Sequence, residues 1–211
     1  MRTAAYRLAR ADLLSRPGQT ALTAFAIFAA ATALVVTLAL RAGLDEPFAD
    51  AMEQTNGAHV SVSGELTDAD VETLATLPGV AAAESKPRAN VRAPLGGGSV
   101  DVGLEELPTE IGRPHVTEGR APASPSEVLV ERSFAREEAL QVGDTLTLGD
   151  TAYVIAGLAV TTQQATYPRW RPGLVWAPEV TSNRRWVGIR LTDPEAIEPY
   201  VAAARQALGG D

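Results

Sequence analysis

The sequence predicts an α+β extracytoplasmic domain of two small α/β subdomains, carried on an N-terminal transmembrane helix. Three observations predict this arrangement. Residues 21–40 contain no charge, residues 57–211 mix short strand-like segments with short helical patterns, and a proline-rich passage at 107–127 divides that mixture. The chain has 211 residues, which leaves about 170 outside the membrane, enough to bury a packed core.

The uncharged run is expected to be a transmembrane helix that is retained in the protein. Twenty helical residues rise about 30 Å, the thickness of the hydrocarbon core of a bilayer. A core helix of a soluble domain is usually shorter and has one polar face, which this run lacks. A cleaved signal peptide is the other alternative, but its apolar region is shorter and ends in small residues, whereas Arg41 follows this run.

The charges that flank the run predict its orientation. Four arginines and a single acidic residue precede it, and four acidic residues follow Arg41. Basic flanks are retained in the cytoplasm, so the N-terminus should be cytoplasmic and the bulk of the chain extracytoplasmic, at the cell (inner) membrane. We therefore expect a cytoplasmic amphipathic helix at 1–18, the membrane span at 19–42 and a polar helical stalk at 43–56.

The segment after the stalk is expected to place one helix on a sheet. Thr67 is the predicted N-cap of this helix, Asp68 and Asp70 lie in its first turn, and Pro78 ends it. A Gly-rich turn at 95–99 joins the last two strands of this segment. The expected strands are residues 59–63, 80–93 and 100–104.

The segment after the proline-rich passage is expected to be richer in strands. It contains one predicted helix at 133–140 and a tight hairpin turn formed by "GDT" at 149–151. The expected strands are residues 128–130, 145–148, 153–160 and 174–177.

The end of the chain is expected to return to the first subdomain. A last strand is predicted at 186–191, and Asp193 is the predicted N-cap of a final helix that has Pro194 at its first position. Pro199 should kink or restart this helix. The extracytoplasmic domain, residues 57–211, would then contain two subdomains. They comprise about 57–106 with 186–211, and 107–185.

The charge balance excludes some partners. The chain has 18 basic and 26 acidic residues; five of the arginines and one acid lie at or before residue 41, which leaves 13 basic and 25 acidic residues outside. Such an acidic domain is not expected to bind nucleic acid or to lie flat on anionic lipid. The absence of cysteine excludes thiolate metal ligands and thiol nucleophiles.

The sequence predicts neither an enzyme nor a cofactor site. The two histidines, His59 and His115, fall in different predicted subdomains, so a shared metal site is not expected. Ser99, Asp101 and His115 have the residue types of a hydrolytic triad, but no nucleophile elbow surrounds Ser99. The glycines at 96–98 lack the Lys-Ser/Thr of a phosphate-binding loop.

One polar loop, residues 161–173, contains candidate contact residues. Aromatic residues and arginine on loops are enriched in protein interfaces. Two interpretations are open: the loop contacts an extracellular protein, peptide or lipid ligand, or Trp170 folds back and covers the edge of the adjacent sheet. The candidate partner-contact residues are Tyr167, Arg169, Trp170 and Arg171.

The order of these motifs resembles the MacB/FtsX-type permeases of ABC transporters. "RPGQTALTAFAIFAAATALVV" resembles the first membrane helix of that family. "VTEGRAPASPSEVLVERSFAREEALQVGDTLTLG", followed by "YVIAGL", resembles its external domain, where a Gly-Arg, a short strand, a helix, a Val-Gly-Asp turn and a strand pair recur. The resemblance spans nearly the whole chain. It implies one porter-like subdomain and one smaller, β-rich, Sabre-like subdomain, without catalytic residues.

The resemblance also implies a function and partners. A separate cytoplasmic ABC ATPase subunit would hydrolyse ATP, and the permease would relay its motion outward to export or release a substrate or to activate an external partner. Family members have further membrane helices after the external domain, so this chain is expected to be a fragment or half of a permease. It would then act with the remaining permease helices or a second permease copy. The alternative is a single-pass anchored extracellular binding module.

Overall fold

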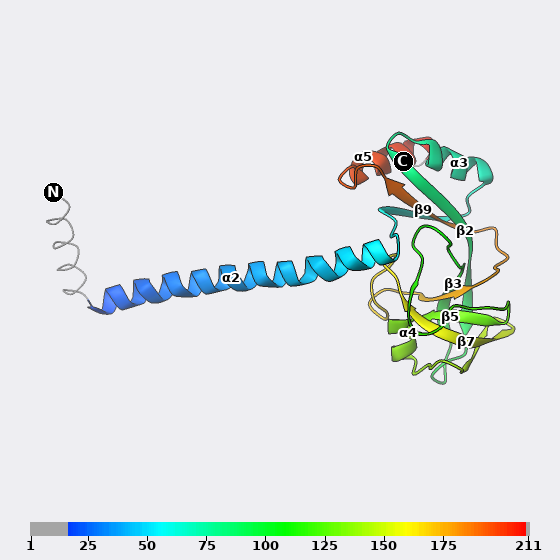
Figure 1. The fold of residues 1–211 in the computed structure, drawn as a ribbon, viewed down its shortest axis with the longest axis horizontal. Helices are drawn as coiled ribbons and strands as arrows, with labels where there is room; N and C mark the ends of the chain where they lie inside the picture. The colour runs from blue at the N-terminus through cyan, green and yellow to red at the C-terminus, as the bar shows by residue number, and fades with distance from the viewer. Residues whose placement is uncertain (1–16, 210–211) are drawn as a thin grey trace. The chain divides into compact units, whose positions relative to one another are not determined.

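The computed structural model describes residues 17–209, and its first element is a long helix, α2 (Pro17–Gln54) (Figure 1). Three threonine hydroxyls in α2 donate to carbonyl groups one turn earlier; for example, Thr32 Oγ1 lies 2.9 Å from the Phe28 oxygen. Residues Ala21–Leu38 form a candidate membrane span. The expected cytoplasmic helix at 1–18 lies almost entirely outside the described residues.

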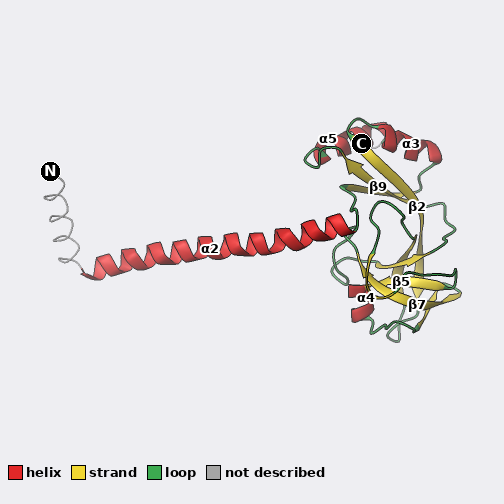
Figure 2. Ribbon diagram, viewed as in Figure 1, coloured by secondary structure: helices red, strands yellow, loops and turns green. Residues whose placement is uncertain are grey.

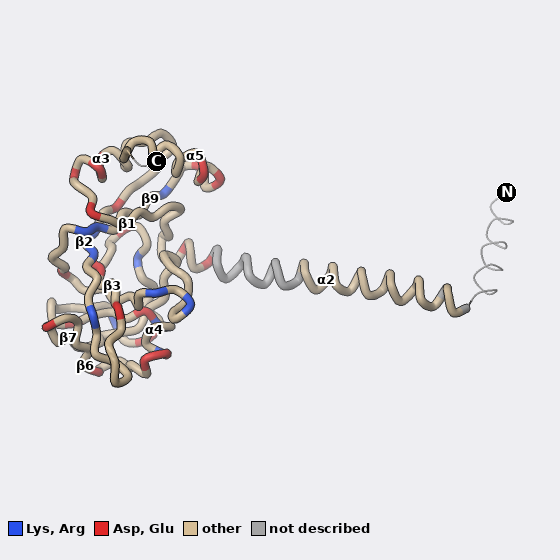
Figure 3. Tube along the Cα trace, turned by 180° about the vertical axis from the view of Figure 1, so that it is seen from behind, with Lys and Arg blue, Asp and Glu red and all other residues tan. Residues whose placement is uncertain are grey.

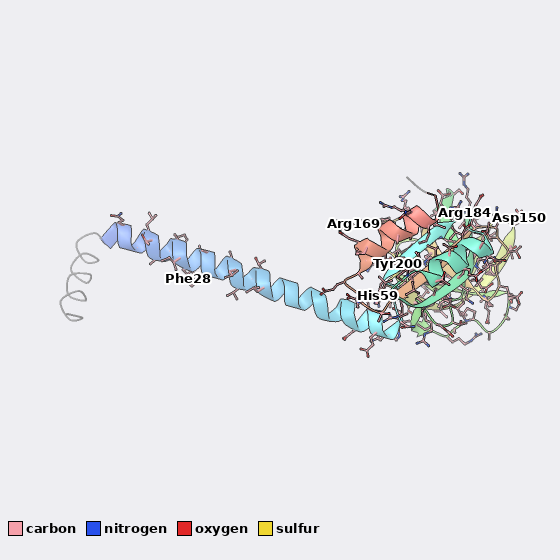
Figure 4. The ribbon with its side chains drawn as sticks, turned by 90° about the horizontal axis from the view of Figure 1, so that it is seen from above. Phe28, His59, Asp150, Arg169, Arg184 and Tyr200 are labelled. Carbon is pink, nitrogen blue, oxygen red and sulfur yellow. The ribbon has the colours of Figure 1, made fainter. Side chains whose placement is uncertain are left out.

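The apolar side chains of this candidate span are exposed. Phe28, labelled in Figure 4, projects from α2 with 70% of its surface accessible. Figure 3 shows no charged residue along this part of α2. This part of α2 is long and apolar enough to cross a membrane, and the crossing itself stays a prediction.

The chain divides into two units, Met1–Phe48 and Ala49–Asp211, and the second contains every strand described (Figure 2). The nine strands form one connected sheet in the order β1-β9-β2-β3-β8-β5-β7-β4, and β6 pairs with β7. Neighbours are antiparallel except for β3 with β8 and β5 with β7. The strands are β1 (Val60–Gly64), β2 (Val80–Ala93), β3 (Val100–Glu106), β4 (His115–Gly119), β5 (Glu127–Glu131), β6 (Thr145–Leu148), β7 (Thr151–Val160), β8 (Gly173–Ala177) and β9 (Arg185–Leu191).

Strand β2 takes part in two groups of strands. Its first half, Val80–Pro87, pairs with β9, and its second half, Arg88–Ala93, pairs with β3. Strand β3 continues to β8, so it lies beside strands of the predicted second subdomain although its residues fall within 57–106. The division of the domain into two subdomains stays a prediction, and this pairing favours a boundary inside β2.

Two helices cover one face of β1, β9 and β2 (Figure 1). They are α3 (Asp68–Thr76) and α5 (Ile197–Ala207), and Leu74, Ile189 and Tyr200 lie in the core beneath them. The Tyr200 hydroxyl donates to the Leu74 carbonyl at 3.1 Å and so joins the two helices. The predicted N-cap of α3 is confirmed, because Thr67 and Asp70 form a reciprocal capping box.

The predicted start of the final helix is wrong. Helix α5 begins at Ile197 with Ala196 as its N-cap, and Asp193 instead accepts a hydrogen bond from the Glu195 N–H at 3.0 Å in a preceding turn. Pro199 gives the physical reason. Proline lacks the N–H that an interior helical position donates, so the helix starts where Pro199 falls in its first turn.

A second core lies between β5, β7, β8 and β3 on one side and the short helix α4 (Arg132–Glu137) on the other. Phe134 of α4 and Val175 of β8 are fully buried there. Helix α4 ends earlier than the predicted residue 140, because Ala139 takes a positive φ of 54° that a helix does not allow. The predicted tight turn is confirmed, since β6 ends at Leu148 and β7 begins at Thr151; Figure 4 labels Asp150 in this turn.

Strand β4 was not expected from the sequence, because it lies inside the proline-rich passage. It pairs with β7 at the edge of the sheet, where two glycines allow a close approach of the chains. A Cβ on Gly119 would lie 2.4 Å from the Ala156 oxygen, and one on Gly157 would lie 2.5 Å from the Arg120 oxygen. Gly119 also has a φ of 71°. Backbone proximity, rather than side-chain alternation, therefore defines this strand.

Candidate functional site

The loop between β7 and β8 is anchored in the second core by Tyr167. This side chain is 5% exposed, and its ring meets the Phe134 ring edge-on with centroids 5.0 Å apart. Its N–H donates to Ser133 Oγ at 2.8 Å, and its hydroxyl donates to Glu138 Oε1 at 2.9 Å. Burial and the Glu138 carboxylate raise the pKa of Tyr167, which keeps this donor protonated. Tyr167 thus anchors the loop, and its contact with a partner stays a prediction.

The hydrogen bonds of Tyr167 extend through Ser133 to the buried carboxylate of Glu131. Ser133 Oγ donates to Glu131 Oε2, and the same carboxylate accepts the Phe134 N–H at 2.9 Å as the N-cap of α4. Glu131, Ser133 and Tyr167 are all buried, so these hydrogen bonds are shielded from water. They fix the position of the residues that follow Tyr167 in the loop.

The other three candidate residues of the loop face outward. Arg169 and Arg171 are exposed, and Trp170 is 55% exposed; Figure 4 labels Arg169. Trp170 lines a groove with residues from β1 and β2. Contact of these three side chains with a partner stays a prediction.

This groove lies over the face of β1, β9 and β2 that α3 and α5 leave uncovered. In the sheet register, Ser63 is opposite Trp186, and Lys86 is opposite Trp186 on the other side, so these side chains share that face. Arg88, two residues beyond Lys86, lies on the same face. The groove has a volume of about 310 Å³.

Four arginines and no acidic residue line this groove, although the domain is acidic overall. Arg88 forms an ion pair with Glu105 at 2.7 Å, and Arg185 forms one with the exposed Asp68 at 2.7 Å. Among the described residues, Arg171 and Arg184 form no ion pair; Figure 4 labels Arg184. These two guanidinium groups give the groove uncompensated positive charge.

A neighbouring hollow of about 480 Å³ extends the groove along β2. The two share Asn90, Arg171 and Pro172, so Arg171 stands where they meet. Arg92 and Asp101 line the far end and form a solvent-exposed ion pair at 3.4 Å. The combined groove is longer than a single small ion requires.

A short loop held on the same sheet face is positioned by Glu84. Its carboxylate accepts the N–H groups of Thr109 (2.9 Å), Glu110 (2.9 Å) and Ile111 (2.6 Å), together with the Thr109 hydroxyl. Burial alone would raise the pKa of Glu84, but these hydrogen bonds lower it below its usual value. The loop covers Trp186 through Ile111 and so closes one end of the exposed face.

The end of α2 and the residues after it form a second candidate site, the helix junction, residues 51–57. Thr55 is fully buried; its hydroxyl donates to the Ala51 carbonyl at 2.7 Å and lies 3.0 Å from Thr162 Oγ1, which is therefore the donor of that second bond. Gly57 has no space for a side chain, because a Cβ there would lie 2.4 Å from Met52 Sδ.

The helix junction also bonds to both groups of strands. The Asn56 amide donates to the Glu110 carbonyl at 2.7 Å, and Arg190 of β9 donates to the Gly57 carbonyl at 2.7 Å. Thr162 lies directly after β7. Any displacement of this junction would therefore act on β9 and on the loop after β7 together.

The comparison with protein families identifies this architecture. Residues 20–207 match the model of the MacB-like periplasmic core domain. This chain belongs to that family. The resemblance to MacB-type permeases and the expected α+β class with one N-terminal candidate transmembrane helix are thus confirmed.

Solved structures of related domains are distant from this member of the MacB-like family. The extracellular domain of the noncanonic ABC-type transporter YknZ from Gram-positive bacteria is 13% identical, with a TM-score of 0.44 over 69% of this chain and 86% of that chain. The periplasmic region of MacB from Actinobacillus actinomycetemcomitans is 11% identical, with a TM-score of 0.40 over 71% and 77%. The comparison with curated proteins gave no match.

The fold of this MacB-like domain does not bring together the residues that the sequence offered as a hydrolytic triad or as a histidine metal site. Ser99 precedes β3 and Asp101 lies in it, whereas His115 lies in β4, with β8, β5 and β7 between them in the sheet. His59 lies beside β1, near the opposite edge. Within residues 17–209, no group of three or more His, Asp and Glu is arranged to hold a metal ion.

We expect His59 to make the stability of this MacB-like domain depend on pH. Its Nδ1 accepts the Leu191 N–H at 2.9 Å, and burial, with a further contribution from Arg190, lowers the pKa of His59 below 6.5. The unfolded chain then binds a proton first as the pH falls through 6.5, so stability decreases below that pH and levels off below the folded pKa. Thermal unfolding between pH 7.5 and 5 should show this decrease.

The matched variant for this prediction is His59→Asn, whose side-chain oxygen can accept the same hydrogen bond without titrating in that range. The loss of stability between pH 7.5 and 5 should be smaller in this variant than in the wild type. An equal loss in both proteins would assign the pH dependence to other groups.

Proposed function

We propose that this chain is the extracytoplasmic part and first membrane helix of a MacB-type permease, which relays motion from a partner ATPase. Residues 1–18 would lie on the cytoplasmic side of the cell membrane, residues 19–42 would cross it, and the β-rich unit would lie outside. Family membership supports a place in an ABC transporter system. The charge asymmetry of the flanks supports the orientation.

The helix junction is the observation that carries the relay. A relay needs a connection that moves when the membrane helix moves, and the bonds of Thr55, Asn56 and Gly57 reach β9, the loop at Glu110 and the loop after β7. Thr55 and Gly57 are both buried, so the junction is packed and not a free linker. In the relay, displacement of the membrane helix would shift Thr55 relative to Thr162, and a crosslink between these residues would block that shift.

A disulfide across the helix junction tests the relay. The chain contains no cysteine, so Thr55→Cys with Thr162→Cys introduces a single pair at positions whose hydroxyl oxygens are 3.0 Å apart. The transporter complex is purified by an affinity tag on the full chain. Oxidation of the two cysteines to a disulfide should lower its ATPase turnover, and a reductant should restore the turnover. Thr145→Cys with Val154→Cys is the matched control, because these residues pair across β6 and β7 away from the junction.

The outcomes separate the proposals. Unchanged ATPase turnover in the crosslinked junction variant would contradict the relay, as would an equal loss in the control pair. In intact cells, a reductant that does not cross the membrane should open the crosslink if the domain is extracytoplasmic. A crosslink that opens only after the cells are permeabilised would contradict the orientation.

The second candidate function is a single-pass anchored binding module, and the arginine-lined groove favours it. Such a module would bind its partner with the same affinity whether or not nucleotide is present. A partner affinity that changes when ATP is added to the transporter complex would favour the relay instead.

A further inference from the structure

We propose that the groove between Trp170 and β2 binds an acidic peptide segment of an extracytoplasmic partner protein. The inference goes beyond the relay; binding in the groove does not depend on the relay, and only the location of the partner rests on the orientation proposed above. Arg171 and Arg184 form no ion pair among the described residues, and guanidinium groups bind carboxylates in a planar, two-bond geometry. In a domain with about twice as many acidic as basic residues, this acid-free groove is the place for an anionic partner.

Two glutamine side chains, Gln163 and Gln164, also line the groove, and each has one amide atom without a hydrogen-bond partner among the described residues. The Gln163 Nε2 donates to the Gly112 carbonyl at 3.2 Å, which leaves its Oε1 as a buried acceptor without a partner. The Gln164 Nε2 is a buried donor without a partner. Both groups lie within the wall of the groove, and rotation of either side chain would offer a hydrogen-bonding group to the backbone of a bound peptide.

Trp170 and the length of the groove point to the same occupant. Trp170 leaves 55% of its surface exposed, which suits stacking against an aliphatic side chain. The two connected hollows, about 310 and 480 Å³, follow β2 and accommodate several residues in extended conformation. Ser61 and Ser63 of β1 add hydroxyl groups along the same wall. Arg171, where the hollows meet, would hold an acidic side chain near the middle of the segment.

Binding is measured with the full chain in nanodiscs of zwitterionic lipid. The probe is a fluorescein-labelled (Glu-Ala)₅ peptide, and (Gln-Ala)₅ is the neutral probe of equal length. The acidic peptide should bind at least about tenfold more tightly, and its affinity should fall as salt is added, because the arginines are partly open to water. Trp170 and Trp186 both line the groove, so the part of the change in tryptophan fluorescence that disappears in Trp170→Phe reports on Trp170.

The variant that tests the groove is Arg171→Gln with Arg184→Gln. It should weaken binding of (Glu-Ala)₅ about tenfold or more and leave the melting temperature unchanged, since neither arginine has an ion pair to lose. The matched control is Arg113→Gln with Arg132→Gln, which removes the same charge at two exposed positions outside the groove. The control should bind the peptide as the wild type does.

Three results would overturn the proposal. Equal binding of the neutral and acidic peptides would remove the role of carboxylates, and an equal loss in both double variants would reduce the effect to net charge. Displacement of the peptide by millimolar inorganic phosphate, or binding to vesicles of anionic phosphatidylglycerol with the same dependence on Arg171 and Arg184, would make the groove a phosphate or lipid headgroup site.

Discussion

Replacing Arg88 by methionine should lower the free energy of unfolding by about 3–5 kcal/mol, one of the two largest losses we expect from a single substitution in the domain. Glu105 is 1% exposed, and its Oε1 lies 2.7 Å from Arg88 NH1. Burial raises the pKa of Glu105, and the Arg88 charge opposes that shift. Without Arg88 the carboxylate would stay charged and unpaired in the interior or would have to bind a proton.

A double-mutant cycle measures this effect by thermal or denaturant unfolding of the full chain at pH 7.5. Arg88→Met with Glu105→Leu should regain most of the lost stability, because replacing both members of a buried ion pair by apolar groups is far less costly than removing one. If Arg88→Met has the same free energy of unfolding as the wild type, the ion pair with Glu105 does not contribute to stability. The role of Arg88 would then be limited to lining the groove.

Replacing Phe134 by alanine should lower the free energy of unfolding by about 3–5 kcal/mol. Phe134 is fully buried, packs edge-on against Tyr167 and lies so close to Gly173 that a Cβ there would be 2.6 Å from its ring. Truncation would leave a cavity that the surrounding strands cannot fill. It would also remove the packing that positions the loop carrying Trp170.

Phe134→Leu is the control for this prediction, because it keeps most of the apolar volume and should cost much less. Denaturant unfolding gives the stability, and fluorescence of Trp170 reports on the loop. A loss below about 1 kcal/mol for Phe134→Ala would show that the ring is not part of a tightly packed core.

Elements set by local chemistry were predictable from the sequence. The uncharged run of α2, the capping box at Thr67 and the two-residue turn at Gly149–Asp150 each depend on a few adjacent residues. The start of α5 depends on local chemistry too, but two signals compete there. Asp193-Pro194 has the pattern of a helix start, and Pro199, five residues on, overrides it.

Features that depend on distant residues were not predictable. Strand β4 exists because Gly119 and Gly157, far apart in the sequence, let two backbones meet. The groove combines β1, β2, the residues before β9 and the loop after β7, and only Trp170 and Arg171 of this set stand out in the sequence. Arg88 and Arg184 had no local signal, because their importance comes from strand register. Tyr167 and Trp170 are both aromatic residues of the same loop, so the sequence does not distinguish them. They differ in the structure, where Tyr167 is buried and Trp170 is exposed.

The sharing of β2 has a consequence for how the domain comes apart. This one strand of 14 residues supplies hydrogen bonds to β9 at one end and to β3 at the other. If the group of strands around β9 or the group around β3 were expressed alone, the part of β2 that pairs with the other group would be left with unpaired backbone amides. The two groups should therefore unfold together in one cooperative transition. Insertions in the turns between strands would leave this pairing intact. An insertion near Pro87 would interrupt β2 between the half that pairs with β9 and the half that pairs with β3.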